Sequence, residues 1–348
     1  MSALSEQQPA YCVSLQHIAD ARQRISKFVN ATPLLTSSYM TSLSGRHQLF
    51  FKCELFQKTG SFKFRGATNA VQSIISSGVP APCVVTHSSG NHAAALSLAG
   101  RDGGLPALIV MPNNAPSSKV AATRHYGGEV SFCEPTSEAR AALAAELVEK
   151  NKGAVFVHPS EDPRVIAGQG TVGYEIAVEL LSKPESFADV VIIPVGGGGL
   201  AGGSAVALKG LLGQRGVKVV LAEPAAVDDA YRSFYSRELV TAQREVGATS
   251  VADGLKTTLG PNSFPLVRDF ADAVITVTEK EILAATKLVW ERMKLMIEPS
   301  AGVGVAVLLS DEFKRAYPVE TYRRVSVVLC GGNVDLMATL KSMEDAGV

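Results

Sequence analysis

The chain has 348 residues, 46% of them hydrophobic, and its 33 Lys and Arg side chains are balanced by 33 Asp and Glu side chains. This length predicts about two domains, and the apolar content can build sizeable cores. The charge balance provides no basic surface for nucleic acid, and no run of about 18 uncharged apolar residues predicts a membrane span.

Neither the start of the chain nor its cysteines suggest an oxidising compartment. The first residues lack a basic segment followed by an apolar core, so the expected location is the cytoplasm. The cysteines are scattered without CxxC spacing, at Cys12, Cys53, Cys83, Cys133 and Cys330. That scatter argues against a disulfide framework and a zinc site, and reduced thiols are expected.

The order of apolar segments predicts an α/β fold. A strand-like run covers residues 49–55, and from about residue 83 short Val- and Ile-rich runs alternate with longer helical patterns. The further predicted strands cover residues 83–86, 107–111, 130–133, 155–157, 190–195, 217–222, 274–277 and 325–329. Their nearly continuous apolar character is typical of strands buried on both faces of a mostly parallel sheet, which indicates a doubly wound arrangement.

Lys63 is the candidate covalent anchor of this chain. It stands among apolar and small residues in Ser61-Phe62-Lys63-Phe64-Arg65-Gly66-Ala67, just after the first strand-like run. Burial lowers the pKa of an amine, and a neutral amine can form a Schiff base. The alternative is a solvated lysine at the start of a surface helix.

A glycine loop follows the predicted strand 190–195 and leads into a helix that begins near Leu200. Four glycines let backbone amides approach a phosphate at the positive end of that helix. The loop consists of Gly196, Gly197, Gly198, Gly199 and Leu200. With Gly202 and Glu223 it also satisfies the dinucleotide fingerprint, so NAD is an alternative ligand. The motif comes late in the chain and leaves Lys63 unexplained, which weighs against NAD.

A second loop follows the predicted strand 83–86 and consists of Ser88, Ser89, Gly90, Asn91 and His92. The lysine segment, this loop and the glycine loop, in this order, resemble the fold type II family of pyridoxal-phosphate enzymes over nearly the whole chain. Segments outside them are similar to the serine racemase and serine/threonine dehydratase branch, namely 53–60, 167–171, 289–294 and 298–304.

The resemblance implies two doubly wound, mostly parallel sheets in two domains. Residues 1–77 and 160–348 would form the large domain and residues 78–159 the small one, with pyridoxal 5′-phosphate in the crevice between them. Lys63 and the glycine loop would hold the cofactor, Asn91 would hydrogen-bond its 3′-oxygen, and Cys330 would face its pyridine nitrogen. The alternative for Cys330 is an inert buried thiol.

Cys330 also bears on the chemistry, because serine racemases usually carry serine there and some dehydratases carry cysteine. Either group is less acidic than aspartate, so the cofactor ring is a weaker electron sink. That favours elimination or rapid reprotonation over reactions that need a long-lived carbanion.

The resemblance also assigns groups to the substrate. Lys63 would serve one face of the α-carbon and Ser89 the other, unless Ser89 only caps the following helix. The substrate carboxylate would meet the loop from Ser88 to His92, with Arg140 nearby. The alternative for Arg140 is the solvated face of a helix over residues 137–150.

The implied activity is interconversion of L- and D-serine, with elimination of water from serine to give pyruvate and ammonia. One alternative is a serine/threonine dehydratase with little racemase activity. Another is a racemase or lyase of aspartate or hydroxyaspartate, because Ser160 replaces an asparagine near the substrate. Lys256 is then a candidate partner for a second carboxylate.

Two further sites are implied, together with a homodimer. Glu223, Val227 and Asp229 match a divalent-cation site whose oxygen ligands suit Mg²⁺ or Ca²⁺. Ala94 and Tyr39 depart from the family's ATP effector site, and Ala94 replaces a glutamine. The retained effector positions are Ser37, Ser38, Lys58, Thr59, Tyr126, Lys294 and Asn333.

Overall fold

The computed structural model describes residues 11–182, 187–240 and 249–348. Its larger sheet has six strands in the order β1-β2-β10-β7-β8-β9. Their bounds are β1 Leu34–Leu35, β2 Gln48–Cys53, β7 Val190–Pro194, β8 Lys218–Pro224, β9 Ala273–Val277 and β10 Arg324–Leu329. Only the pair β1 and β2 is antiparallel, and every other pair in this sheet is parallel.

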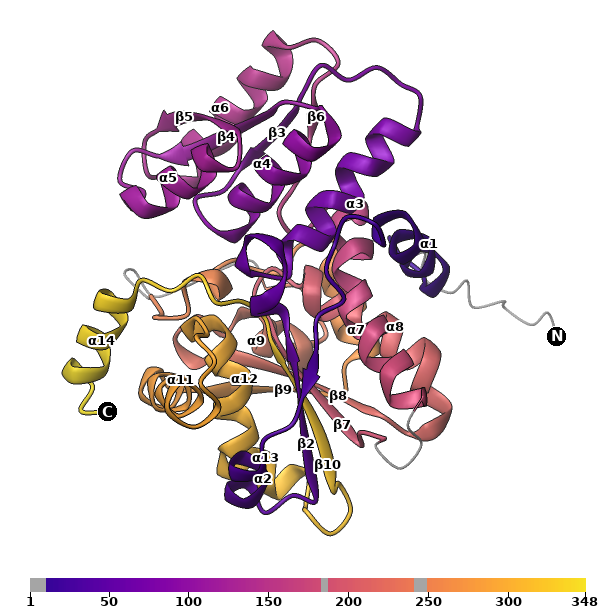
Figure 1. Ribbon diagram of the computed structural model, residues 1–348, viewed down its shortest axis with the longest axis vertical. Helices are drawn as coiled ribbons and strands as arrows, with labels where there is room; N and C mark the ends of the chain where they lie inside the picture. The colour runs from indigo at the N-terminus through magenta and orange to yellow at the C-terminus, as the bar shows by residue number, and fades with distance from the viewer. Residues whose placement is uncertain (1–10, 183–186, 241–248) are drawn as a thin grey trace, which may run out of the picture.

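The smaller sheet has four parallel strands in the order β5-β4-β3-β6. Their bounds are β3 Val84–His87, β4 Ala107–Pro112, β5 Gly128–Cys133 and β6 Val155–Phe156. Figure 1 shows this sheet and its helices as a separate body beside the larger sheet. The predicted fold class of two mostly parallel sheets is therefore confirmed. Every predicted strand is present, and β1 alone was not predicted, because two residues give no readable pattern.

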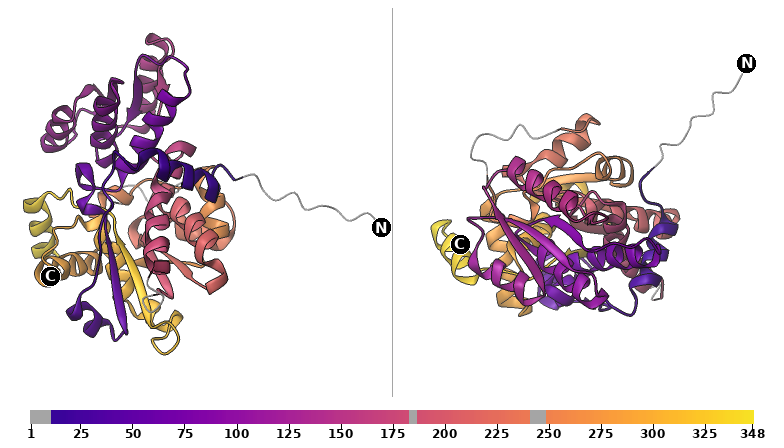
Figure 2. Two further views of the ribbon diagram at one scale, coloured as in Figure 1. Left: turned by 45° about the vertical axis from the view of Figure 1, so that its right-hand side comes forward. Right: turned by 90° about the horizontal axis from the view of Figure 1, so that it is seen from above.

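The helices cover both sheets. Their bounds are α1 Leu15–Ile25, α2 Ser38–Ser44, α3 Lys63–Ser76, α4 Asn91–Gly103, α5 Ser117–His125, α6 Ser137–Lys150, α7 Pro163–Ser182, α8 Gly199–Leu212, α9 Asp229–Ser236, α10 Ser263–Phe270, α11 Glu279–Met293, α12 Pro299–Leu309, α13 Asp311–Ala316 and α14 Leu336–Asp345. In Figure 1, α7 and α8 lie on one side of the larger sheet and α11 and α12 on the other. The view from above in Figure 2 shows the smaller sheet stacked over the larger body.

Each sheet has its own hydrophobic core. The core of the larger sheet includes α12, which is buried along nearly its whole length because it is apolar on all sides. The core of the smaller sheet includes one face of α3, with Phe64, Ala67 and Val71 packed among residues of α4 and β4. Helix α3 therefore begins at the larger body and contributes to the core of the smaller one.

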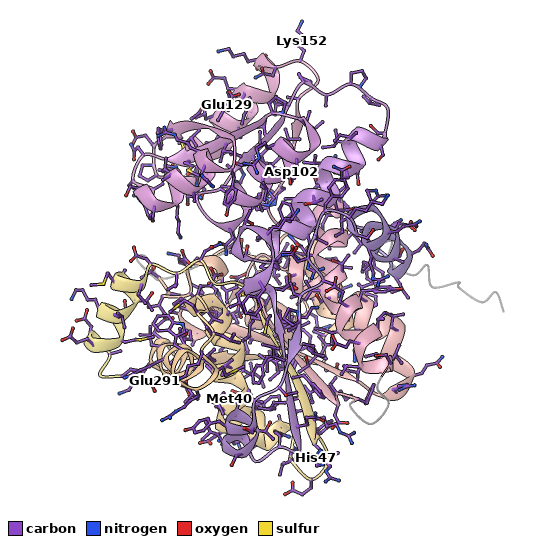
Figure 3. The ribbon with its side chains drawn as sticks, in the orientation of Figure 1. Met40, His47, Asp102, Glu129, Lys152 and Glu291 are labelled. Carbon is purple, nitrogen blue, oxygen red and sulfur yellow. The ribbon has the colours of Figure 1, made fainter. Side chains whose placement is uncertain are left out.

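Six labelled side chains mark the two bodies. Figure 3 places Asp102, Glu129 and Lys152 on the body of the smaller sheet, and Met40, His47 and Glu291 on that of the larger sheet. Across the described residues, no helix combines the length and the apolar character that crossing a bilayer requires.

Candidate active site

The candidate site lies where the carboxyl ends of parallel strands meet. The loop 88–90 follows β3, the glycine loop follows β7, and Cys330 follows β10. β3 belongs to the smaller sheet and β7 and β10 to the larger one, and in parallel α/β sheets ligands bind at the carboxyl ends of the strands. The fold thus brings together segments that are far apart in the sequence.

Lys63 is the first residue of α3, and its Nζ donates a hydrogen bond to the carbonyl oxygen of Pro159 at 2.8 Å. Its side chain stays partly accessible, and its amine lies over the ring of Phe62, 5.2 Å from the ring centroid. Burial lowers the pKa of Lys63 to about 8, with Cys330 and Glu298 opposing that shift. The alternative of an ordinary solvated lysine is therefore wrong. Near pH 7 a part of the protein molecules carries an unprotonated amine at Lys63.

The glycine loop packs closely against the segment that contacts Lys63. Gly198 precedes α8 with a φ of 80°, in the left-handed region that glycine tolerates, and no side chain caps this helix. A Cβ on Gly197 would lie 2.5 Å from Oγ of Ser160. The first N–H groups of α8 and this glycine cradle therefore suit a phosphate. Pro159 and Ser160 connect the phosphate cradle to Lys63.

The loop from Ser88 to His92 leads into α4. The residue that caps α4 is Gly90, and it makes no side-chain cap hydrogen bond. The hydroxyl of Ser88 accepts a hydrogen bond from N–H of Gly90 at 3.3 Å. The alternative that Ser89 only caps this helix is therefore wrong, and its hydroxyl is not committed to that role. His92 is buried, and burial together with the charge of Lys63 holds its pKa well below the usual value.

Asn91 lies at the centre of a polar cluster with Glu298 and Asn333. Its Nδ2 donates to the two carboxylate oxygens of Glu298 at 3.0 and 3.1 Å, and its Oδ1 accepts from Nδ2 of Asn333 at 2.8 Å. Burial, followed by the charge of Asp253, raises the pKa of Glu298 to about 7. The side chain of Asn91 is thereby held at the site by a group that titrates near neutral pH.

Glu298 is a site residue that sequence reasoning missed. It immediately precedes Pro299, the first residue of the apolar helix α12, and it is 3% exposed. The signal was available, because a carboxylate joined to a helix that is apolar on all sides is drawn into the protein with it. Without a visible partner in the sequence, no role could be assigned to it.

Cys330 follows β10, and its backbone is joined to the residue before Lys63, while its place opposite the ring nitrogen of the cofactor stays a prediction. Its carbonyl oxygen accepts a hydrogen bond from N–H of Phe62 at 3.1 Å. Burial, and then the charge of Glu298, raises the pKa of its thiol well above the usual value. The group present at this position is therefore a neutral thiol, which is a weak partner for a ring nitrogen.

Arg140 lies on α6, with its guanidinium turned to the start of its own helix. Its Nε donates to the carbonyl oxygen of Thr136 at 3.2 Å, and its NH2 nitrogen donates to Oγ of Ser137 at 3.1 Å. Burial lowers the pKa of His87, which precedes the substrate loop, and the charge of Arg140 adds to that shift. A contact between Arg140 and the substrate carboxylate stays a prediction.

The predicted metal ligands gather at the end of β8. Both carboxylate oxygens of Glu223 accept backbone N–H groups, from Ala230 at 2.8 Å and from Tyr231 at 2.7 Å. Asp229 accepts from N–H of Leu259 at 2.9 Å. Burial, and then the charge of Asp229, raises the pKa of Glu223 well above its usual value. Two buried carboxylates this close fit a bound cation.

A cavity of about 460 Å³ adjoins the cluster of Asn91 and Glu298. Three of the predicted nucleotide residues line it, namely Thr59, Tyr126 and Asn333, and so does Ala94. The other four predicted positions are not among its lining residues, and they lie at the start of α2, in the segment before Thr59 and at the end of α11.

Comparisons with known proteins place this geometry in a family. A model described as "Pyridoxal-phosphate dependent enzyme" matches residues 25–331. The chain is 45% identical to the serine racemase of Homo sapiens over 338 residues, which is 97% of this chain and 96% of that protein. The alternative of an NAD enzyme is therefore wrong.

Solved structures agree. The structure of maize serine racemase has a TM-score of 0.88 and 39% identity, and the match covers 96% of this chain and 98% of that one. The serine racemase of Dictyostelium discoideum has a TM-score of 0.84 and 42% identity, covering 93% of this chain and 99% of that one. The chain belongs to the family of pyridoxal-phosphate-dependent enzymes.

Proposed function

We propose that this protein is a pyridoxal-phosphate-dependent racemase that interconverts L- and D-serine and also eliminates water from serine to give pyruvate and ammonia. The observation that carries the proposal is the amine of Lys63, whose pKa of about 8 makes it nucleophilic, beside the glycine cradle and the loop 88–92. The choice of serine as the substrate is supported by relatives named serine racemase, which match this chain over nearly its full length.

The residues present fit the cofactor. The first turn of α8 would hold its phosphate, Lys63 would bind it covalently, Asn91 would donate to its 3′-oxygen, and Cys330 would face its ring nitrogen. When bound, pyridoxal phosphate supplies the electron sink that stabilises negative charge at the substrate α-carbon. The neutral thiol of Cys330 would leave that sink weak, so negative charge at the α-carbon would be stabilised less than beside an acidic partner.

Two groups of this chain would move protons on opposite faces of the substrate. Lys63, once displaced by the substrate amine, would take the α-proton of L-serine. Ser89 would return a proton to the other face, which gives D-serine. If the β-hydroxyl leaves first, the products are pyruvate and ammonia. The hydroxyl of Ser89 is available for this role because Gly90, and not Ser89, caps α4.

Ser160 is the residue most relevant to the choice of amino acid. It is buried against the glycine loop, and its N–H donates to Nδ1 of His158 at 3.2 Å. The next residue, Glu161, accepts from N–H of Asn262 at 2.7 Å. An acidic group next to this turn disfavours a substrate with a second carboxylate, so we propose serine over aspartate.

We also propose a divalent cation, Mg²⁺ or Ca²⁺, on Glu223, Asp229 and the carbonyl oxygen of Val227. ATP is proposed as an effector at the 460 Å³ cavity. Ala94, which lines that cavity, offers no hydrogen bond where animal racemases place glutamine, so the effect of ATP on turnover should be small.

We also propose that the protein is a homodimer and that it is located in the cytoplasm. Each chain would have a large domain, formed by residues 1–77 and 160–348, and a small domain, formed by residues 78–159. Helix α14 lies at the periphery in Figure 1, and Leu336, Met337 and Leu340 on it are 42%, 75% and 44% exposed. Exposed apolar side chains on one helix are suited to burial against a second copy.

The decisive experiment is a time course of cofactor-loaded protein with L-serine and Mg²⁺, following D-serine and pyruvate together. L-threonine and L-aspartate are run in parallel. D-serine with pyruvate supports the proposal. Pyruvate alone would make the protein a dehydratase, and turnover confined to aspartate would overturn the substrate assignment.

A further inference from the structure

Four charged side chains are buried together behind the catalytic lysine. They are Lys52 on β2, Glu54 just after it, Arg65 on α3 and Glu175 on α7. Their side chains are 2%, 0%, 0% and 17% exposed, respectively. Two positive and two negative charges balance, and the side-chain hydrogen bonds of the four within the described residues go to one another and to Asn30, Thr32 and Thr171.

Arg65 is the centre of this cluster. It pairs with Glu54 through Nε at 2.7 Å and NH2 at 2.8 Å, and with Glu175 through NH1 at 2.7 Å and NH2 at 2.8 Å. One guanidinium thus makes two paired contacts with carboxylates, the geometry that fixes both distance and orientation. Nζ of Lys52 donates to Glu175 and to the carbonyl oxygen of Thr32, both at 2.7 Å.

Stability alone does not account for such a cluster. Removing charges from water is costly, and buried ion pairs can often be replaced by apolar residues of similar volume without loss of stability. What ion pairs supply is a fixed geometry. Arg65 lies on α3, two residues after Lys63, so the geometry that its ion pairs fix is that of the start of α3.

Lys63 and Arg65 leave the same helical turn in nearly opposite directions. At 3.6 residues per turn, residues two apart point about 200° from each other. Lys63 reaches Pro159, and Arg65 reaches Glu54 and Glu175 in the larger body. Figure 1 shows α3 at this junction, next to α7 and α1. Fixing the guanidinium therefore fixes the backbone from which the amine extends.

The start of α3 depends on these tertiary contacts. Phe62 precedes the helix and provides no side-chain cap. N–H of Gly66 donates instead to Oε1 of Gln169 on α7 at 3.1 Å. A Cβ on Gly168 would lie 2.6 Å from Cα of Gly66, so α3 and α7 are in direct backbone contact. Without a cap of its own, this turn takes its position from α7 and from the pairs of Arg65.

We infer that Arg65 is a positioning residue for Lys63: its paired contacts with Glu54 and Glu175 hold the first turn of α3 so that the amine of Lys63 meets the cofactor and the substrate α-proton. The inference rests on the proposed function for its kinetic test. N–H of Phe62, bound to Cys330, fixes the segment from the other side.

The test compares Arg65→Lys and Glu175→Gln with wild type and with Lys209→Met. Lysine keeps the charge of Arg65 but cannot make two paired contacts. Glu175 is the more exposed carboxylate, so its variant is the safer one for folding. The control removes a partly buried ion pair at the far end of α8, Lys209 with Asp272, whose side chains are 24% and 20% exposed.

The first readout is the rate at which cofactor-free protein captures pyridoxal phosphate, followed by the visible band of the lysine-bound cofactor. The second is kcat and KM for L-serine, with the isotope effect of α-deuterated L-serine. We expect kcat and the capture rate to fall about 10- to 100-fold in both cluster variants, because small misplacements of a reacting group have effects of this size. KM should change little, and the isotope effect should rise because proton removal becomes slower.

The control should lose stability and keep the wild-type capture rate. If the cluster variants also unfold more easily but capture the cofactor and turn over L-serine at wild-type rates, the cluster is only structural and the inference is wrong. Absence of serine turnover in wild type would instead refute the proposed function. The capture rates would still decide the role of Arg65.

Discussion

Asn91 and Glu298 join the two bodies of the molecule at the active site, through hydrogen bonds of 3.0 and 3.1 Å from one amide nitrogen to two carboxylate oxygens. Asn91 begins α4 beside the smaller sheet, and Glu298 precedes α12 on the larger one. An amide nitrogen carries two protons, so Asn91 can keep one bond to Glu298 and offer the other to the cofactor oxygen.

Replacing Glu298 by Gln should change how stability depends on pH. The pKa of Glu298 is raised to about 7, so between about pH 4.5 and 7 the folded protein binds more protons than the unfolded chain. Protonated Glu298 therefore contributes to the free energy of unfolding. This contribution is fully present below pH 4.5, is lost as the pH rises through 7, and amounts to about 3 kcal/mol in total. Urea unfolding of cofactor-free protein at several pH values should show a smaller decline for Glu298→Gln. Glu129→Gln, on the surface, should behave like wild type; an unchanged decline in Glu298→Gln would contradict the assignment.

Lys63→Ala should abolish racemisation and elimination together, because both reactions require the same covalent anchor. The visible band of the lysine-bound cofactor should be missing after incubation with pyridoxal phosphate. Lys152→Ala, on the exposed edge of the smaller body, should retain both the band and turnover. A persistent band in Lys63→Ala would show that another lysine is the anchor.

Capture of the cofactor by Lys63 should depend on pH with a midpoint near 8. Burial lowers the pKa of this amine to about 8, and only the neutral amine is nucleophilic. The capture rate should therefore fall about tenfold for each pH unit below the midpoint and level off above it. Stopped-flow absorbance on cofactor-free protein measures this directly. A midpoint near that of an ordinary lysine would contradict the burial of the amine.

Ser89→Ala should separate the two reactions. Elimination from L-serine starts with Lys63 and should continue, whereas formation of D-serine should drop about 10²- to 10⁴-fold, the usual contribution of a positioned acid or base. Pyruvate measured in the same reaction serves as the internal control. Equal loss of both products would refute the assignment of one group to each face.

Mg²⁺ or Ca²⁺ should raise the unfolding temperature, because a cation on Glu223 and Asp229 binds only the folded protein. At a hundred times Kd the gain is about 2.7 kcal/mol, and a chelator should reverse it. Glu223→Gln should lose this response. Asp228→Asn, at the neighbouring residue that pairs with Arg232, should keep it. A response that survives in Glu223→Gln would place the cation elsewhere.

Much of the fold could be predicted from local pattern. Buried parallel strands read as short apolar runs, and their bounds agree with the structure to within about two residues. The helix over 137–150 coincides with α6, and the glycine loop leads into α8 at Gly199. These features depend on residues that are neighbours in the sequence, so they can be predicted from the sequence.

The sequence by itself determined the strand-forming segments and the glycine loop, and it singled out Lys63 as the candidate anchor, because residue type and spacing are local properties. Only the tertiary structure decided that Gly90 caps α4, that Glu298 holds Asn91, and that Arg65 pairs with two carboxylates behind Lys63. These relationships join residues distant in sequence, and burial sets their pKa values. No local pattern reports which charges meet once the chain has folded.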